Sequence, residues 1–514
     1  VINEPFNPEV WVGNKQVGLC WAAETNVTWL QDELDYAIMV IPGERATELR
    51  VQFVDHAVTL TEPLTVEFAL MPTPIKPLDP RLREIRMGAS SRCIAARNHG
   101  IGEGICDWYA IAFGNELDPM YDSFPFPGDT DKSRAAVQKL RDNNVGFIPY
   151  GAMAYTNAMF ADARQMYEQW HTLPVSQHTL GRYEKYDAGE TEDYAKTNWG
   201  HWEGYRVCMT PESYHDFFVD MWVRAIREHD IDGIYLDHGE VSHGCQNPNH
   251  DHFIDPETQP GKYFYGIFGA RELLKRLWIA SKAEKPEIVT VLHQSRPSKL
   301  LNGFLDICAS GEVINVFFCG EHHGRDIIAD PTLYVPDYDL LPPVYFEMEF
   351  LESYGFDSRI LPEVKFCNQQ YLKDNPELAT LWTAILMKNT LLSGARLYAG
   401  NMDQQALEDM WRGMDSIGPL EPEVSFHPWH SNVAMIAAVA ETTRVSFYQR
   451  PGKTLVIVGN DSTEAVNERI TLSTGDTYVN AIDAQTGNEV VLANSTVTLT
   501  VPARVYRMVL LTTE

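Results

Sequence analysis

The chain has 514 residues, which exceeds one ordinary domain and suits a barrel of about 250 to 350 residues with smaller β modules beside it. Apolar residues make up 44% of the sequence, so we expect a large core and little disorder. The 41 basic and 71 acidic residues give a net charge of −30, which argues against binding to nucleic-acid phosphates. This balance favours a neutral ligand, or an anionic ligand bound in a local basic pocket.

No stretch approaches the roughly 18 consecutive apolar residues of a membrane span. The chain begins at Val1 without a basic and apolar leader, so we expect a mature or truncated product that is secreted or periplasmic. The eight cysteines are scattered from Cys20 to Cys367, unlike a disulfide framework. We expect Cys93 and Cys308, which lie in apolar runs, to be small core residues. A homo-oligomer remains open.

Residues 1–80 are predicted to form part of an N-terminal β-sandwich. Strand residues with partial alternation occur in 11–21, 48–54 and 64–70. The proline-rich segment 71–80 marks the boundary with the next domain.

Residues 81–425 alternate short apolar runs with helical periodicity, and this pattern predicts a catalytic (β/α)8 barrel of the α/β class. The eight predicted strands are 92–98, 145–150, 205–208, 232–237, 288–293, 304–308, 359–366 and 395–399. The predicted helices are 131–144, 211–229, 267–283, 344–353 and 376–392. The insertion 155–203 is rich in aromatic residues, and long loops at a barrel mouth are usually functional.

Residues 426–514 return to β patterning and predict a C-terminal antiparallel β-sandwich. Strands are expected at 455–460 and 505–511, with a hairpin near 484–488.

Asp237 ends the short apolar run 234–236, which has the length and residue types of a buried parallel strand. Because burial of an ionised carboxylate is costly, such a residue is usually functional or ion-paired. In a (β/α)8 barrel the C-terminal strand ends form the floor of the active site, so the position favours a catalytic role.

Glu312 follows the predicted sixth strand and would face the same mouth. Glycoside hydrolysis requires two carboxyl groups, one to attack or stabilise the oxocarbenium-like centre and one to protonate the leaving oxygen. Asp237 and Glu312 are our candidates for these two roles. Asp306 is expected to be structural. The spacing leaves other acids open as alternatives to Glu312, namely Glu240, Glu321, Glu347 and Glu349.

A carbohydrate substrate is the expected partner of such a carboxylate pair, and the 11% of aromatic residues is compatible with stacking on sugar rings. His293 ends the fifth predicted strand and could donate a hydrogen bond to a sugar hydroxyl or play a structural role. Core packing is the alternative for the aromatic candidates. The further substrate-binding candidates are Glu240, Arg97, His99, Trp108 and Trp202.

The segment 243–252 concentrates soft metal ligands just beyond the fourth predicted strand. Cys245, His250 and His252, completed by Cys208, would form a closed set of four ligands for a structural zinc ion. No cofactor is expected for the chemistry itself. A hydrolytic metal site built from Asp237 and the histidines is the alternative mechanism, and the sequence has no glycine-rich phosphate loop and no GxSxG motif.

Several stretches together resemble a family of glycoside hydrolases that has a β-sandwich, a barrel and a C-terminal β domain. These stretches are Trp11–Asn14, Gly18–Trp21, Ala69–Pro77, Asp232–Asp237, Cys245–His250, Ala270–Leu277 and Ser310–Glu312. The family is similar to glycoside hydrolase family 123, and more distantly to family 129 and the α-galactosidase-like barrels.

The α-galactosidase-like barrels use a nucleophilic Asp on strand four and an acid/base on strand six in a retaining mechanism. The resemblance therefore implies Asp237 as the nucleophile and Glu312 as the acid/base of an exo-acting retaining glycosidase that removes a terminal sugar from an oligo- or polysaccharide. Family 123 instead uses an adjacent Asp-Glu pair, whereas His238 follows Asp237 here. A non-catalytic carbohydrate-binding or assembly-forming barrel and a metal-dependent hydrolase are the alternatives.

Overall fold

The computed structural model describes most of the chain outside several loops. The described residues are 7–31, 37–88, 104–106, 135, 138, 141–142, 145–157, 161–172, 204–239, 244–255, 257–294, 298–311, 345–346, 352–361, 376–399, 402–420, 423–437 and 439–514.

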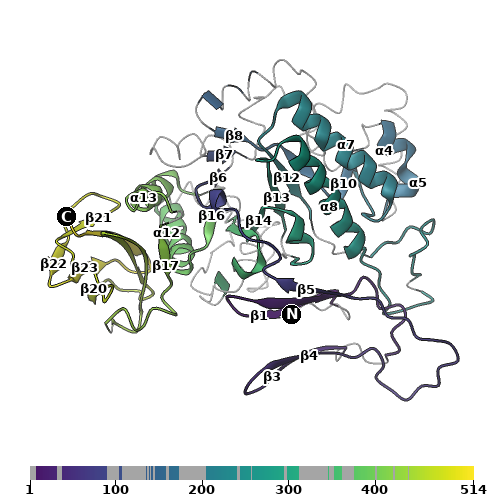
Figure 1. Cartoon of the computed structure of the whole chain (residues 1–514), viewed down its shortest axis with the longest axis horizontal. Coiled ribbons are helices and arrows are strands. Elements are labelled where there is room, and N and C mark those ends of the chain that lie inside the picture. The colour runs from purple at the N-terminus through teal and green to yellow at the C-terminus, as the bar shows by residue number, and fades with distance from the viewer. Residues whose placement is uncertain are drawn as a thin grey trace.

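A parallel sheet forms the centre of the molecule (Figure 1). Within the described residues its strands are hydrogen-bonded in the order β8-β7-β6-β16-β15-β14-β13-β12-β9, and neighbouring strands run parallel. In chain order they are β6 (Arg86–Gly88), β7 (Gly104–Cys106), β8 (Val145–Phe147), β9 (Tyr150–Ala152), β12 (Gly233–Asp237), β13 (Val289–His293), β14 (Ile307–Ser310), β15 (Asp357–Ile360) and β16 (Arg396–Ala399). The two strands at the ends of this order, β8 and β9, are separated in the chain by only Ile148 and Pro149.

Alternate residues of the central strands pack into two different clusters, as the period of two in a β-strand requires. Ile234 and Leu236 join a cluster with the apolar faces of α7 (Glu212–His229) and α8 (Ile267–Glu284). Tyr235 belongs to a second cluster, which lies on the opposite face of the sheet and contains residues from β6, β13, β14 and β16. Figure 1 shows α7 and α8 side by side next to β12 and β13. The sheet is therefore buried on both faces, which explains why β12 and β13 are mostly apolar.

The C-terminal residues form two antiparallel sheets. One has the order β17-β18-β19-β24-β21, and the other has the order β20-β23-β22. Val456 and Val509 of the first sheet and Ile470 and Val497 of the second share one buried cluster, so the sheets pack face to face. The strands are β17 (Ser425–His427), β18 (Thr443–Arg450), β19 (Lys453–Asn460), β20 (Val466–Thr471), β21 (Asn480–Asp483), β22 (Val491–Ala493), β23 (Thr496–Val501) and β24 (Tyr506–Thr512).

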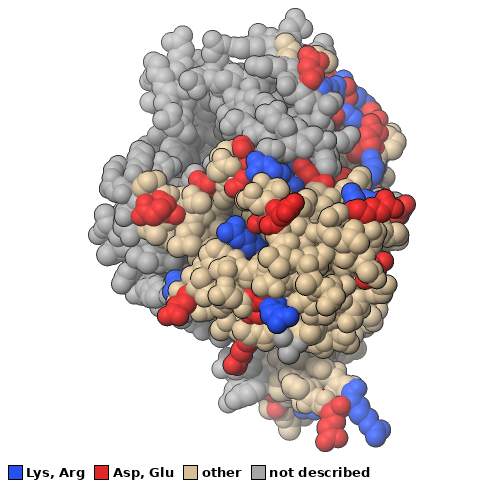
Figure 2. Space-filling model, turned by 90° about the vertical axis from the view of Figure 1, so that its left-hand side faces the viewer, with Lys and Arg blue, Asp and Glu red and all other residues tan. Residues whose placement is uncertain are grey.

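Two helices, α12 (Pro376–Ser393) and α13 (Gln404–Asp415), join the C-terminal sheets to the central sheet. Leu386 of α12 and Met410 of α13 lie in a buried cluster with Leu455 and Met508 of the larger C-terminal sheet. Among the described residues on the face shown in Figure 2, basic side chains are scattered among acidic ones and do not gather into a basic patch. Within the described residues, no helix combines the length and apolarity needed to cross a bilayer.

The N-terminal residues form a three-stranded antiparallel sheet and a separate hairpin. The sheet contains β1 (Glu9–Gly13), β2 (Gly18–Ala22) and β5 (Ala69–Thr73), and the hairpin contains β3 (Ile38–Pro42) and β4 (Thr47–Val51). The remaining elements are short. They are η2 (Pro80–Arg83), β10 (Tyr155–Asn157), α4 (Ala161–Gln165), α5 (Tyr167–Trp170), β11 (Gly204–Arg206), η6 (Leu301–Phe304) and η10 (Glu352–Tyr354).

The structure confirms the strands predicted at 232–237, 288–293 and 395–399, because β12, β13 and β16 lie there. The helices predicted at 211–229, 267–283 and 376–392 are also confirmed as α7, α8 and α12. The strands predicted at 145–150, 304–308 and 359–366 overlap the observed strands but are displaced: 145–152 is divided into β8 and β9, β14 begins at Ile307, and β15 begins at Asp357.

The strand predicted at 205–208 was wrongly placed in the central sheet. Residues 204–206 form β11, which pairs antiparallel with β10 in a separate two-stranded sheet. The central sheet instead contains β6 and β7, which sequence reasoning did not identify. The first strand predicted at 92–98 lies outside the described residues, as do most of the residues of the helices predicted at 131–144 and 344–353. Helix α13 was also missed.

Candidate functional site

Asp237 is the last residue of β12 and lies at the C-terminal end of the central sheet. It is two residues beyond Tyr235 and therefore projects from the same face of the sheet, the face of the second buried cluster. Its side chain is 19% exposed. His238 follows with φ of 53°, a left-handed conformation that turns the chain away from the sheet.

The carboxylate of Asp237 is held by two donors on the same oxygen. The backbone N–H of His238 donates to Oδ1 over 2.7 Å, and Nδ1 of His293 lies 3.0 Å from that oxygen. Because an ionised carboxylate only accepts hydrogen bonds, this contact requires the proton of His293 to be on Nδ1. Oδ2 lies 3.6 Å from Nε2 of His238, which is longer than a normal hydrogen bond.

His293 is the last residue of β13, next to β12, and its side chain is buried. The ring centroids of Tyr235 and His293 are 6.2 Å apart, and the ring centroid of Tyr398 of β16 lies 6.1 Å from that of Tyr235. Aromatic rings of the second buried cluster therefore lie near His293. Two residues after Asp237, the carbonyl of Gly239 accepts a hydrogen bond from the side-chain amide of Gln294 over 2.9 Å. The turn after Asp237 is therefore fixed by hydrogen bonds from the neighbouring strand.

A polar side-chain group from β10 and β11 lies next to this turn. The ring of Tyr155 meets the ring of His238 edge to face at 4.8 Å, and Nε of Arg206 donates to the Tyr155 hydroxyl over 3.1 Å. Sequence reasoning missed Tyr155, Arg206 and the role of His238 in orienting Asp237. The position of His238 next to Asp237 was visible, but the approach of Tyr155 and Arg206 depends on the antiparallel pairing of β10 with β11.

Most other predicted site residues lie outside the described part of the chain. They are Glu312, Glu240, Arg97, His99, Trp108 and Trp202, together with the alternatives Glu321, Glu347 and Glu349. The strand before Glu312 is described: β14 ends at Ser310, pairs with β13 and is followed by Gly311 with φ of 106°.

Asp306 behaves as a structural residue, as predicted. Its carboxylate accepts hydrogen bonds from the backbone N–H of Thr290 and from Nζ of Lys282, each over 2.9 Å. It precedes β14 and so lies at the opposite end of the strand from the one that leads to Glu312.

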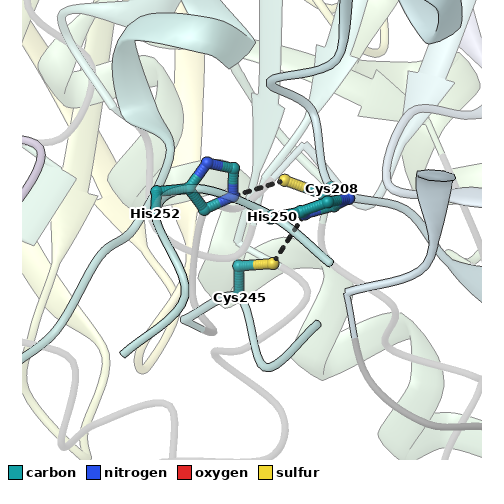
Figure 3. Close-up of side chains that lie close together, drawn as sticks. All are labelled: Cys208, Cys245, His250 and His252. Atoms are coloured by element: carbon teal, nitrogen blue, oxygen red, sulfur yellow. Dashed lines mark hydrogen bonds between the residues drawn. The ribbon is translucent and has the colours of Figure 1, made fainter. Parts of the chain in front are cut away.

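The four predicted metal ligands come together (Figure 3). The ligand atoms of Cys208, Cys245, His250 and His252 all lie within 4.8 Å of one another. Sγ of Cys208 is 3.4 Å from Nε2 of His252, and Sγ of Cys245 is 3.2 Å from Nδ1 of His250. Asp237 does not belong to this group, which is the one potential metal-ligand group found among the described residues.

The electrostatics of this cluster favour a thiolate. A hydrogen bond from the Cys208 thiol lowers the pKa of Cys245 below its ordinary value, against the opposing effect of burial. The same hydrogen bond, together with burial, raises the pKa of Cys208 above its ordinary value. Burial lowers the pKa of His250, but its hydrogen bonds with Cys245 and the carbonyl of Gln169 outweigh burial and raise the pKa overall. Thiolate is the form of cysteine that binds metals.

A cavity of about 520 Å³ lies at the other end of the central sheet. Its lining includes Arg86 and Arg396, the first residues of β6 and β16, and Phe426 and Tyr448 of the larger C-terminal sheet. In barrel enzymes the active site lies at the C-terminal ends of the strands, so this cavity is not our candidate site.

No protein-family model matches the chain, and no curated protein matches it. Among solved structures it is similar to an α-amylase from Geobacillus thermoleovorans in complex with acarbose, at 11% identity and a TM-score of 0.49, over 82% of this chain and 90% of that one. It is also similar to an α-amylase from Lactobacillus plantarum, at 9% identity and a TM-score of 0.47, over 84% of this chain and 100% of that one.

A third similar structure is a variant of a β-L-arabinopyranosidase from Geobacillus stearothermophilus in complex with arabinose. It has 10% identity and a TM-score of 0.40, over 85% of this chain and 97% of that one. Similarities of this extent do not assign a family or an activity, so the resemblance to family 123 stays a prediction.

Proposed function

We propose that this protein is a glycoside hydrolase in which Asp237 is the nucleophile and Glu312 is the acid/base. One observation carries the proposal: a partly exposed carboxylate ends a buried parallel strand and is oriented by His293 from the adjacent strand. A nucleophilic carboxylate must be ionised and held in one geometry, and two hydrogen-bond donors on Oδ1 serve both needs.

The barrel that this mechanism needs is supported by the strand order. β8 and β9 stand at opposite ends of the hydrogen-bonded order, yet only Ile148 and Pro149 separate them in the chain. If 145–152 is one interrupted strand, the parallel sheet closes on itself as an eight-stranded (β/α)8 barrel, with β12 fourth and β14 sixth. The packed C-terminal sheets would form a β-sandwich beside it.

In the proposed reaction, the carboxylate of Asp237 attacks the anomeric carbon while the carboxylic acid of Glu312 protonates the departing glycosidic oxygen. Water, activated by the Glu312 carboxylate, then cleaves the glycosyl ester and releases the sugar with its configuration retained. His293 keeps the Asp237 carboxylate oriented through Nδ1, and a hydrogen bond from this histidine to a sugar hydroxyl remains a prediction. We propose an exo-acting enzyme that removes a terminal sugar from an oligo- or polysaccharide.

The contact between Asp237 and His293 also favours a second function, a barrel that binds carbohydrate without cleaving it. In that case the carboxylate would serve to fix the barrel or to accept hydrogen bonds from sugar hydroxyls. The metal-dependent hydrolase has less support, because among the described residues the potential metal ligands do not include Asp237.

A panel of nitrophenyl glycosides and natural oligosaccharides tests the proposal. We expect hydrolysis of at least one member, and we expect Asp237→Asn and Glu312→Gln each to lower kcat by orders of magnitude. Asp232→Asn is the matched control, because Asp232 precedes β12 at the opposite end and bonds to Arg141 and Lys285. Near-normal turnover in both catalytic-site variants would remove the assignment, whereas binding without turnover would favour the second function.

Two further measurements test the retaining mechanism itself. A fluorinated glycoside of the hydrolysed sugar should form a covalent ester at Asp237 that peptide mass spectrometry identifies. In a crystal structure, the two carboxyl groups should lie about 5–5.5 Å apart, since inverting enzymes separate them by about 6.5–9.5 Å.

A further inference from the structure

The cluster of two cysteines and two histidines lies outside the proposed catalytic pair and joins two separate segments of the chain. Cys208 lies two residues after β11, and its N–H donates to the carbonyl of Trp170 over 2.7 Å. Cys245, His250 and His252 belong to the connection between β12 and α8. Figure 3 shows the four side chains converging on one point.

The backbone of the second segment is held against residues 168–172 by hydrogen bonds. The N–H of Gln246 donates to the carbonyl of Thr172 over 2.7 Å. The fully buried side-chain amide of Asn247 donates to the carbonyls of Glu168 and His171 over 3.0 and 2.9 Å. These hydrogen bonds bring Cys245 near Cys208, and none of them involves the four ligand side chains.

Two sulfur–nitrogen distances in the cluster are close to those around a small tetrahedral ion. With Zn–S bonds of about 2.3 Å and Zn–N bonds of about 2.0–2.1 Å, neighbouring ligand atoms of a tetrahedron lie roughly 3.3–3.8 Å apart. The two sulfur–nitrogen contacts are 3.4 and 3.2 Å, and every pair of ligand atoms lies within 4.8 Å.

The histidine orientations also suit metal ligation. Nε2 of His250 lies 2.9 Å from the carbonyl of Gln169, and a proton donated there leaves the lone pair of Nδ1 facing Cys245. Such an outer hydrogen bond fixes the tautomer of most metal-binding histidines. His252 directs Nε2 at Cys208, and its ring stacks on Phe264 at 4.1 Å, which restricts its rotation.

We propose that Cys208, Cys245, His250 and His252 bind one zinc ion in a closed tetrahedral site. Two thiolates and two imidazoles suit Zn²⁺ and do not suit Mg²⁺ or Ca²⁺, which take oxygen ligands. Four protein ligands leave no coordination position for water or substrate, so the ion is structural. The ion links the connection between β12 and α8, which begins directly after Asp237, to the segment that contains β11.

Metal analysis of the intact chain tests the proposal without reference to any glycosidase activity. Protein produced with added zinc and purified without chelators is expected to contain about one zinc ion per chain. Cys245→Ser should lose the zinc, whereas Cys20→Ser, a matched change of another buried cysteine without a disulfide, should retain it. His252→Cys should also retain the zinc, because three thiolates and one imidazole form an equally closed set, whereas His252→Ala should lose it.

Cobalt exchange into the wild-type chain keeps the proposal testable if the variants fail to fold. Co²⁺ should give the visible absorption of a tetrahedral site and a near-ultraviolet thiolate-to-cobalt band. A wild-type chain that binds neither ion with its thiols reduced, or a native disulfide between Cys208 and Cys245, would overturn the proposal. Zinc removal should also accelerate proteolysis within 244–255, and an unchanged cleavage rate would overturn the bracing role.

Discussion

The contact between His293 and Asp237 makes a quantitative prediction about catalysis. Nδ1 of His293 is one of two donors on Oδ1 of Asp237, at 3.0 Å. A hydrogen bond to a charged group contributes about 1.5–3 kcal/mol. Because each 1.36 kcal/mol corresponds to a factor of ten in rate, His293→Leu should lower kcat by roughly ten- to 150-fold. Asp237→Asn removes the nucleophile and should have a much larger effect.

The assay compares kcat and KM on the best glycoside from the panel for three variants. His293→Asn can place an amide donor near the position of Nδ1 and should recover much of the activity that His293→Leu loses. His215→Leu serves as the control, because His215 is another buried histidine, on α7, bonded to the carbonyl of Met209. Equal activity in His293→Leu and the wild type, or an equal loss in the Leu and Asn variants, would refute the orienting role.

Two further predictions concern stability and do not depend on an activity. Asp357→Asn should cost about 3–5 kcal/mol, because it removes the charge partner 2.7 Å from the buried guanidinium of Arg359; chemical denaturation measures the loss, and a value below about 1 kcal/mol would match an exposed pair and contradict the reasoning. Burial raises the pKa of Asp461, but its contacts with Arg444 and Lys388 outweigh burial and lower the pKa overall. A carboxylate with a lowered folded-state pKa stabilises the fold at neutral pH and loses this effect as the pH falls through that pKa. Denaturation curves should therefore show Asp461→Asn less stable than wild type at neutral pH, with the difference shrinking below about pH 4, and a difference that stays constant or widens would rule this out.

The sequence alone identified the central strands and helices whose residue pattern reflects burial. β12 and β13 are short apolar runs that end in Asp237 and His293, and both lie where the pattern predicted. α7 has the spacing of an amphipathic helix, and its buried residues include Phe218 and Trp222. These elements were predictable because burial of one face of a helix or strand places apolar residues at regular intervals in the sequence.

Strand partners were decided only by the tertiary structure. The segment 205–208 was predicted as a barrel strand, yet β11 (Gly204–Arg206) pairs antiparallel with β10 outside the central sheet. β6 contains Arg86 and Gly88, so its pattern gave no strand signal, and its pairing with β16 places it in the central sheet. Pairing depends on which backbone edges meet in space, and composition does not encode that.

For the candidate site too, the sequence indicated some features and only the tertiary structure decided others. The sequence indicated Asp237 and the four potential metal ligands because carboxylate, thiol and imidazole groups in such positions suggest chemistry. Sγ of Cys208 lies near Nε2 of His252, and Tyr155 contacts His238. Both contacts form only because segments that are distant in the sequence pack against each other. Sequence specifies which groups are available for chemistry, and their distances are set by long-range packing between segments far apart in the chain.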